Sequence, residues 1–368
     1  MCPHWGLVFS KRDTFTRQHD IGLCIIANEL PELPELVELD AIIAEGGARL
    51  DVRIAGEVTC GEQRFPIHAI CMGNPDPEVP AAGFFGGIHG LERIGAEVVI
   101  AYLHSLVMRL RWDSVLQRQL ESVRLVFMPV VNPGGLFRGT RANPNGVDLM
   151  RNAPVDAVER VPRLLGGQRL SPRLPWYRGR VDAAMEVESE AVCRVVTDEM
   201  LARPFSIAVD CHSGFGVDDR VWFPYAHTVS PIPDLPEIFR LKSIFDQAYP
   251  HHRYVFEPQS AQYLAHGDLW DYLYLRGRAN PERTFLPLTL EMGSWLWVKK
   301  NPRQLLSRHG LFNPLRTHRL HRVLRRHVAW LDFVARAACS HRAWAPGKSD
   351  REGDRKRAMA LWYGGSAA

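Results

Sequence analysis

Two histidines and a glutamate stand where the chain is expected to turn at the ends of apolar strands. His89 and Glu92 are three positions apart, directly after the apolar stretch 81–88, and His212 follows a second apolar stretch, 205–210. Neutral imidazole nitrogens and carboxylate oxygens are good zinc ligands, and a catalytic zinc site uses three protein ligands with one position left open. His89, Glu92 and His212 are therefore candidate ligands of one zinc ion.

The spacing His-x-x-Glu is a weak signal when it stands alone, because such a pair more often caps a helix or lies on the surface. The third residue strengthens it. His212 follows a different strand, and the carboxyl ends of neighbouring strands meet at one edge of a sheet, where ligands bind.

A second carboxylate follows another apolar run. Glu291 comes directly after the apolar residues 285–290, so a buried strand would place its side chain at the same sheet edge. Partial burial raises the pKa of a carboxyl group toward a value that suits a general base. The competing interpretation is a structural glutamate that pairs with an arginine.

The order of apolar segments indicates the fold that positions these residues. A β-hairpin is expected over 49–59 and 64–72, followed by strands and helices that alternate along the chain. Further strands are expected at 81–88, 123–131, 205–210 and 285–290, and helices at 92–110, 183–201, 235–249 and 315–338. Such alternation predicts an α/β fold, with a mixed, largely parallel central sheet flanked by helices on both faces.

Three segments define the expected domain organisation. Residues 1–345 are expected to form a single zinc-hydrolase domain whose motifs lie between about 80 and 295. Residues 153–180, rich in proline and glycine, should form a long irregular loop, which in a compact domain is usually functional or mobile. Residues 346–368 read as a basic, flexible tail.

The bulk composition narrows the class of protein. Of 368 residues, 46% are hydrophobic and 23% are charged, which is ordinary for a globular protein. The net charge is only +4, and the two signs are well mixed along the chain. We therefore expect neither nucleic acid nor a membrane as partner.

The cysteines and the start of the chain bear on its compartment. The seven cysteines are scattered without a C-x-x-C pair, so a disulfide framework is not expected and a reducing compartment is favoured. The apolar run Ile21–Ala27 is too short for a secretory signal or a spanning helix. These features predict a cytoplasmic protein.

Five motifs occur in a fixed order along residues 80–295. They are His89-Gly90-Leu91-Glu92, Asn132-Pro133-Gly134-Gly135, Gly146-Val147-Asp148-Leu149-Met150-Arg151-Asn152, Asp210-Cys211-His212-Ser213 and Leu290-Glu291. Their types and order resemble the zinc carboxypeptidases of the M14 type, of which this chain looks like a divergent member. Five motifs in order are far more specific than any one of them alone.

The resemblance implies a role for each residue of the metal centre. One Zn²⁺ per chain would be held by His89, Glu92 and His212, and Asp148 would hydrogen-bond the first histidine and fix its tautomer. Glu291 would be the general base that takes a proton from zinc-activated water and passes it to the leaving amine.

The resemblance also implies residues that contact the substrate. Arg138 matches the arginine that stabilises the developing oxyanion. Arg151 matches the arginine that grips a terminal carboxylate through its bidentate fork, and Tyr263 matches a mobile tyrosine that covers the substrate.

Three positions depart from the family pattern, all at the substrate end. Met150 stands where the family usually has an asparagine that donates to the carboxylate. Leu91 replaces a polar residue or arginine, and the bulky Trp270 falls near the position that lines the specificity pocket.

These observations predict a zinc-dependent hydrolase of an amide (peptide) bond next to a free C-terminal carboxylate, with a peptide or an acyl amino acid as substrate. One alternative is a zinc amidase or deacylase of small N-acyl amino acids, against which the segment 146–152 and Tyr263 argue. A second is a catalytically inactive binding protein with the same fold, against which the retention of Glu291 and all three ligands argues.

Overall fold

The computed structural model describes residues 32–307 and 309–364. The described residues from Leu33 onward cluster in one compact unit. The apolar run Ile21–Ala27, Cys2 and Cys24 lie outside the described residues, and the five cysteines within them are all free. None of the described helices is long and apolar enough to span a membrane.

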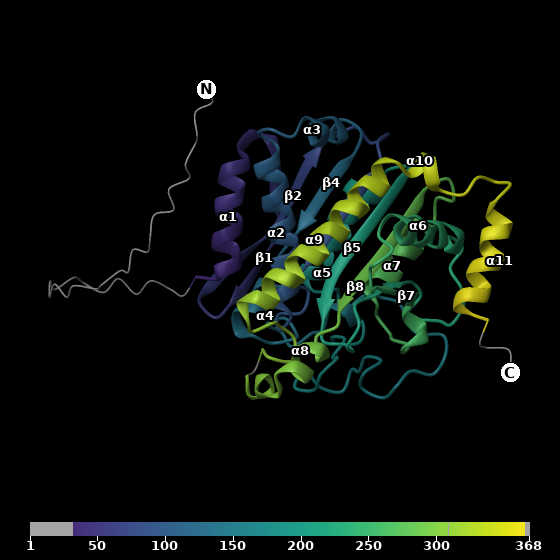
Figure 1. The fold of residues 1–368 in the computed structure, drawn as a ribbon. Coiled ribbons are helices and arrows are strands. Elements are labelled where there is room, and N and C mark those ends of the chain that lie inside the picture. The colour runs from purple at the N-terminus through teal and green to yellow at the C-terminus, as the bar shows by residue number, and fades with distance from the viewer. Residues whose placement is uncertain (1–31, 308, 365–368) are drawn as a thin grey trace, which may run out of the picture. The chain divides into compact units, whose positions relative to one another are not determined.

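An eight-stranded sheet runs through this unit in the order β1-β2-β4-β3-β5-β8-β6-β7 (Figure 1). The strands are β1 (Asp51–Cys60), β2 (Gln63–Gly73), β3 (Ala81–Gly86), β4 (Arg124–Met128), β5 (Phe205–Ser213), β6 (Arg220–Phe223), β7 (Val255–Pro258) and β8 (Thr284–Met292). The central strands β4, β3, β5 and β8 are parallel, whereas β1, β2 and β6 make the antiparallel pairings. The expected hairpin and the mixed, largely parallel sheet are confirmed.

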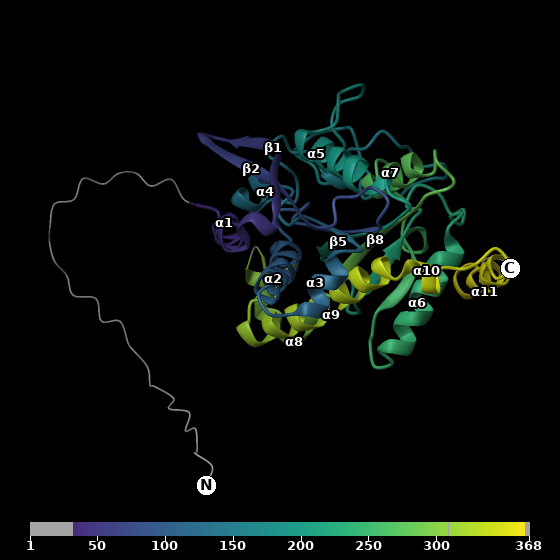
Figure 2. The same ribbon diagram turned by 90° about the horizontal axis from the view of Figure 1, so that it is seen from above.

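The α-helices cover both faces of the sheet. They are α1 (Pro34–Gly46), α2 (Arg93–Arg109), α3 (Ser114–Leu120), α4 (Pro133–Arg138), α5 (Val187–Val196), α6 (Leu235–Ala248), α7 (Leu269–Gly277), α8 (Trp295–Lys300), α9 (Thr317–Cys339), α10 (His341–Trp344) and α11 (Arg351–Trp362). Figure 2 shows α5 and α7 on one face and α2 and α9 on the other. Each face has its own apolar core, which confirms a sheet flanked by helices on both sides.

The central strands are apolar because neither of their faces meets water. Every residue of β3 and β5 is buried, as is expected for parallel strands that are covered on both sides. The polar residues of β5 are Asp210, His212 and Ser213, near its carboxyl end, together with Ser206 near its start. A polar group placed so deep needs a partner, and the partners of Asp210, His212 and Ser213 define the site described below.

The C-terminal segment differs from the expected flexible tail. Residues 351–362 form α11, which packs against α6. The indole nitrogen of Trp362 donates to the carbonyl oxygen of Phe256 at 2.7 Å, and Arg240 on α6 contacts Asp354 at 2.5 Å. The polar composition of this segment suggested a flexible tail, because composition does not reveal the few contacts that hold the helix in place.

The segment 153–180 contains no regular helix or strand, as expected, and hydrogen bonds around Gln168 hold it together. The side-chain amide nitrogen of Gln168 donates to the carbonyl oxygens of Ser171, Leu174 and Pro175. The backbone of Gln168 also forms an isolated β-bridge with Tyr177. These bonds give the loop a defined shape at the edge of the site.

Candidate active site

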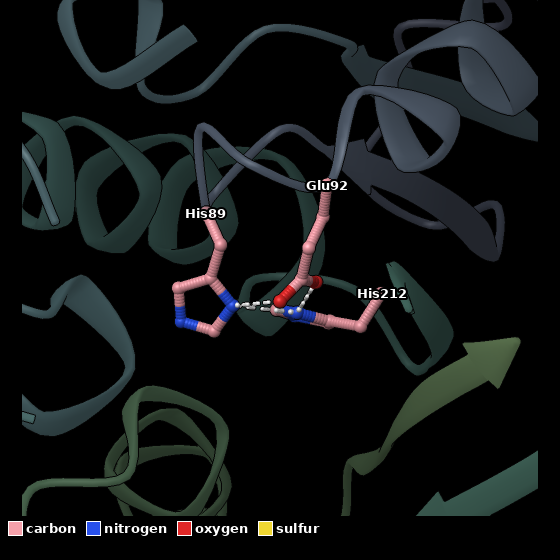
Figure 3. A group of neighbouring side chains, drawn as sticks. All are labelled: His89, Glu92 and His212. Carbon is pink, nitrogen blue, oxygen red and sulfur yellow. Dashed lines mark hydrogen bonds and ion pairs between the residues drawn. The ribbon is translucent and has the colours of Figure 1, made fainter. Parts of the chain in front are cut away.

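The three candidate metal ligands meet at the carboxyl ends of β3 and β5. The Nδ1 atom of His89 lies 2.9 Å from Oε1 of Glu92. The Nδ1 atom of His212 lies 3.1 Å from Oε2 of Glu92 and 3.2 Å from Nδ1 of His89. All three residues are buried, and Figure 3 shows their polar ends converging on one point.

The turn that carries His89 and Glu92 depends on a close approach of two backbone segments. A Cβ atom on Gly90 would lie 2.0 Å from the carbonyl carbon of Gly135, so only glycine fits between the two ligands. Asn132 caps α4 by accepting from the N–H of Gly135 at 2.8 Å, and its amide nitrogen donates to the carbonyl oxygen of Ile88 at 3.0 Å. The Asn-Pro-Gly-Gly motif thus supports the ligand turn.

The outer nitrogen of each histidine faces a buried carboxylate. Nε2 of His89 lies 3.1 Å from Oδ1 of Asp148, and Nε2 of His212 lies 2.5 Å from Oδ2 of Asp210. Such carboxylates fix the tautomer, so that the inner Nδ1 presents its lone pair to a metal. Asp148 was expected from the sequence, and Asp210 was not. The spacing Asp-x-His on a strand could have revealed it, because residues two apart share a face.

The donor set fits a zinc ion. Two imidazole nitrogens and one carboxylate lie within 4.8 Å of one another, which is the ligand chemistry of a catalytic zinc site. Burial opposes a charge on His212, but the carboxylates of Asp210 and Glu92 raise its pKa well above the usual value. The surroundings of the cluster therefore favour positive charge at its centre.

Glu291 lies beside the metal ligands. It is directly opposite His212 in the register of β5 and β8, and it is buried. Burial and then the charge of Glu92 raise the pKa of the Glu291 carboxyl, while His212 and Arg141 oppose that change. A carboxylate with raised proton affinity can accept a proton and release it again within one reaction.

These residues line a single cavity of about 620 Å³. Within it lie His89, Glu92, His212, Asp148, Glu291, Arg151 and Tyr263. The loop 153–180 supplies part of the rim through Leu165 and residues 172–176. The structure thus brings together every candidate residue except Arg138.

Arg138 lies outside the cavity. Its exposed side chain, at the last position of α4, donates to the carbonyl oxygen of Pro144 at 2.8 Å. Gly139 then adopts a left-handed conformation with φ of 60° and turns the chain, so that Arg141 reaches the site instead. Nε of Arg141 donates to Asp148 at 2.8 Å, and Nη1 donates to Glu92 at 3.2 Å.

Arg151 also lines the cavity and is buried, with 2% of its surface exposed. Nη1 donates to the carbonyl oxygen of Met150 at 3.0 Å, and Nε to that of Leu165 at 3.4 Å. Nη2 has no partner among the described residues, and no described carboxylate lies within ion-pair distance. The ring centroid of Tyr263 is 5.7 Å from the guanidinium carbon.

The three positions that depart from the family pattern lie in different surroundings. Leu91 and Met150 line the cavity and add no donor to it. Trp270 does not line the cavity: it packs edge-on against Phe85, with ring centroids 4.9 Å apart, and its indole nitrogen donates to Asp210 at 2.8 Å. Trp270 therefore fills space behind the site and holds the carboxylate that orients His212.

Two named carboxypeptidases are similar in sequence to parts of this chain. The chain is 32% identical over 93 residues to carboxypeptidase SOL1 of Arabidopsis thaliana, across 24% of this chain and 19% of that protein. It is 23% identical over 184 residues to carboxypeptidase D of Anas platyrhynchos, across 48% of this chain and 11% of that protein. The matches thus span a minor part of these longer relatives.

Solved structures and a family model agree with these relatives. The crystal structure of thrombin-activatable fibrinolysis inhibitor has the same fold, with a TM-score of 0.61 and 18% identity over 82% of this chain and 72% of that one. The model of the zinc carboxypeptidase family, the M14 peptidases, matches residues 62–294. Because this match covers more than half of the sequence, the chain belongs to the zinc carboxypeptidase family.

Proposed function

We propose that this protein is a zinc-dependent hydrolase that cleaves an amide bond next to a free C-terminal carboxylate of a peptide. The observation that carries the proposal is the guanidinium of Arg151, which is buried in the same cavity as the metal ligands and has no acidic partner among the described residues. Burying an unpaired charge is costly, and a substrate carboxylate would neutralise it through charge-assisted hydrogen bonds.

The metal centre would use His89, Glu92 and His212 as ligands. Zinc bound there would polarise the scissile carbonyl and lower the pKa of water. Glu291 would accept the proton of the attacking water and then release it to the leaving nitrogen. Its position opposite His212 and its raised pKa support both halves of that transfer.

Arg141, rather than Arg138, would stabilise the negative charge that develops on the carbonyl oxygen. Its guanidinium lines the cavity and is oriented by Asp148 and Glu92. A cation fixed before the reaction stabilises such a charge without reorganisation. Tyr263, whose ring lies beside Arg151, would cover the bound carboxylate.

The test compares two forms of one peptide with the zinc-loaded protein. N-acylated dipeptides with a free terminal carboxylate should be cleaved with a higher kcat/KM than the same dipeptides with a terminal amide. Equal values for the two forms would show that no carboxylate is recognised. Efficient cleavage of N-acyl amino acids but not of peptides would make the protein an amidase, and stoichiometric zinc without any hydrolysis would make it a binding protein.

A further inference from the structure

Three adjacent strands carry two rows of side chains, of which His212, Glu291, Thr289 and Trp222 line the cavity. In the upper row His212 of β5 stands opposite Glu291 of β8. Two residues earlier on these strands, the lower row places Asp210 opposite Thr289, and Trp222 of β6 stands opposite Thr289 on its other side.

The lower row lies one side chain away from the reacting atoms. Residues two apart on a strand point to the same face and are separated by about 6.6 Å. Thr289 and Trp222 line the cavity. We call this lower row the floor of the cavity. With the terminal carboxylate at Arg151 and the scissile bond between the metal site and Glu291, the side chain of the terminal residue would point toward the floor.

Two polar side chains that line the cavity, Thr289 in the floor and Gln259 beside it, have no hydrogen-bond partner among the described residues. Gln259 begins the short 3-10 turn Gln259–Ala261 directly after β7, and it lines the cavity with 7% of its surface exposed. Neither its side-chain amide nor the hydroxyl of Thr289, also 7% exposed, makes a hydrogen bond to the described part of the chain. Buried polar groups are nearly always bonded, so both are available to a ligand.

The turn that carries Gln259 lies against the carboxylate end of the cavity. The carbonyl oxygen of Gln259 accepts from the backbone N–H of Tyr263 at 3.3 Å. The ring of Tyr263 in turn packs edge-on against Trp222 at 6.0 Å and lies 5.7 Å from the guanidinium carbon of Arg151. The amide is therefore on the terminal-residue side of the metal.

Two tryptophans border the floor. Trp222 is 3% exposed, lines the cavity and is fixed by donation of its indole N–H to Glu257 at 3.0 Å. Trp270 lies behind Asp210, whose Oδ2 is engaged by both Trp270 and His212.

Charged groups of both signs surround the floor. The carboxylate of Asp210 belongs to the lower row, and Arg220 stands opposite Glu291 in the upper row, so these charges do not select the sign of a side chain. A side chain that forms hydrogen bonds gains the donor and acceptor that Gln259 and Thr289 offer.

We propose that Thr289 and Gln259 select a terminal residue whose side chain forms hydrogen bonds, such as serine, threonine or asparagine, over one whose side chain is apolar. This inference rests on the proposed function, since it assumes that the carboxylate meets Arg151. It adds the identity of the residue that is released.

The experiment uses the zinc-loaded full chain and N-acylated dipeptides that differ only in the terminal residue. Serine and asparagine should exceed leucine and phenylalanine by about tenfold or more in kcat/KM. Thr289→Val and Gln259→Leu should each lower the ratio of asparagine to leucine by about twofold to tenfold, the effect of one hydrogen bond. The preference for free acid over amide should persist in both variants.

Gln262→Leu is the matched control. Gln262 follows the same turn, is exposed, and donates to Glu257 at 3.0 Å instead of lining the cavity, so its variant should keep the wild-type ratio. Thermal unfolding midpoints of all variants identify any that are misfolded. Leucine equal to or better than asparagine in the wild type, or an unchanged ratio in both floor variants, would overturn the inference.

Two further readings separate this inference from the proposed function. Equal cleavage of acid and amide forms with the side-chain ranking intact would reject carboxylate recognition alone. If nothing is hydrolysed, calorimetry with N-acetylasparagine and N-acetylleucine applies the same test to binding. Tighter binding of the asparagine compound, lost in Gln259→Leu, supports the floor, and equal binding rejects it.

Discussion

The two ends of the cavity are built in opposite ways. At the metal end, both nitrogens of each histidine already have partners, Asp148 and Asp210 outside and Glu92 within. At the substrate end, polar groups lack partners among the described residues, including Nη2 of Arg151. The metal end thus fixes its own geometry, whereas the substrate end keeps its hydrogen bonds for a ligand.

The difference follows from the elements that carry each end. The candidate metal ligands sit at or just after the ends of β3 and β5, strands in which every residue is buried. At the substrate end only Thr289 and Trp222 come from strands, and the other residues come from a short turn at Leu149–Arg151, the loop 153–180 and the turn at Gln259. Irregular segments tolerate sequence change better than central strands do, so divergence from the family is expected at this end.

The largest effect should come from removing a metal ligand. His212→Ala should abolish stoichiometric zinc and all hydrolysis, because two ligands cannot form the three-residue site. Elemental analysis should find about one zinc per chain in the wild type. His104→Ala, at an exposed position of α2, is the control and should keep the metal. Full zinc content in His212→Ala would show that His212 is not a metal ligand.

Glu291→Gln should separate chemistry from metal binding. The amide cannot accept a proton, so kcat should fall by about 10²–10⁴ while zinc remains. Steady-state kinetics and elemental analysis of the same preparation test this expectation. Near wild-type turnover would mean that another group is the base.

Arg141→Ala and Arg138→Ala form a matched pair only three positions apart. Loss of the guanidinium that contacts Asp148 and Glu92 should lower kcat by about 10²–10³. Arg138→Ala should stay close to wild type, because its side chain is exposed and outside the cavity. A fall in kcat for Arg138→Ala but not for Arg141→Ala would show that Arg138 stabilises the oxyanion.

Arg151→Ala should act on recognition more than on chemistry. A charge-assisted hydrogen bond is worth about 1.5–3 kcal/mol, so the preference for free acid over amide should fall by about tenfold to a hundredfold. Arg173→Ala, at the exposed rim of the cavity, is the control. An unchanged ratio of acid to amide in Arg151→Ala would show that Arg151 does not bind the substrate carboxylate.

The smallest effect should come from Met150→Asn. Met150 lines the cavity but packs in the apolar core on that face of the sheet. An added amide donor should raise the ratio of acid to amide by about twofold to tenfold, the value of one hydrogen bond. Competition between the two forms of one peptide measures it. A lower ratio with zinc intact would show that the thioether position does not face the carboxylate.

The local pattern of residues was sufficient for the fold and for bringing the metal ligands together. Apolar runs that end in His89, His212 and Glu291 predict parallel strands with polar carboxyl ends, and the register of β5 and β8 pairs the last two. Such ends meet at one edge wherever the strands are neighbours. These candidate ligands could therefore be selected without knowledge of any distant contact.

Only the tertiary structure decided which side chains surround those residues. The left-handed turn at Gly139 sends Arg141 rather than Arg138 to the site. Trp270 reaches Asp210 across 60 positions of sequence. The turn that carries Gln259 is joined to a distant segment by the bond from the N–H of Ser260 to the carbonyl oxygen of Tyr225 at 3.0 Å. Spacing along the chain fixes which residues share a strand or helix face, but the direction in which a loop returns depends on packing that no local pattern encodes.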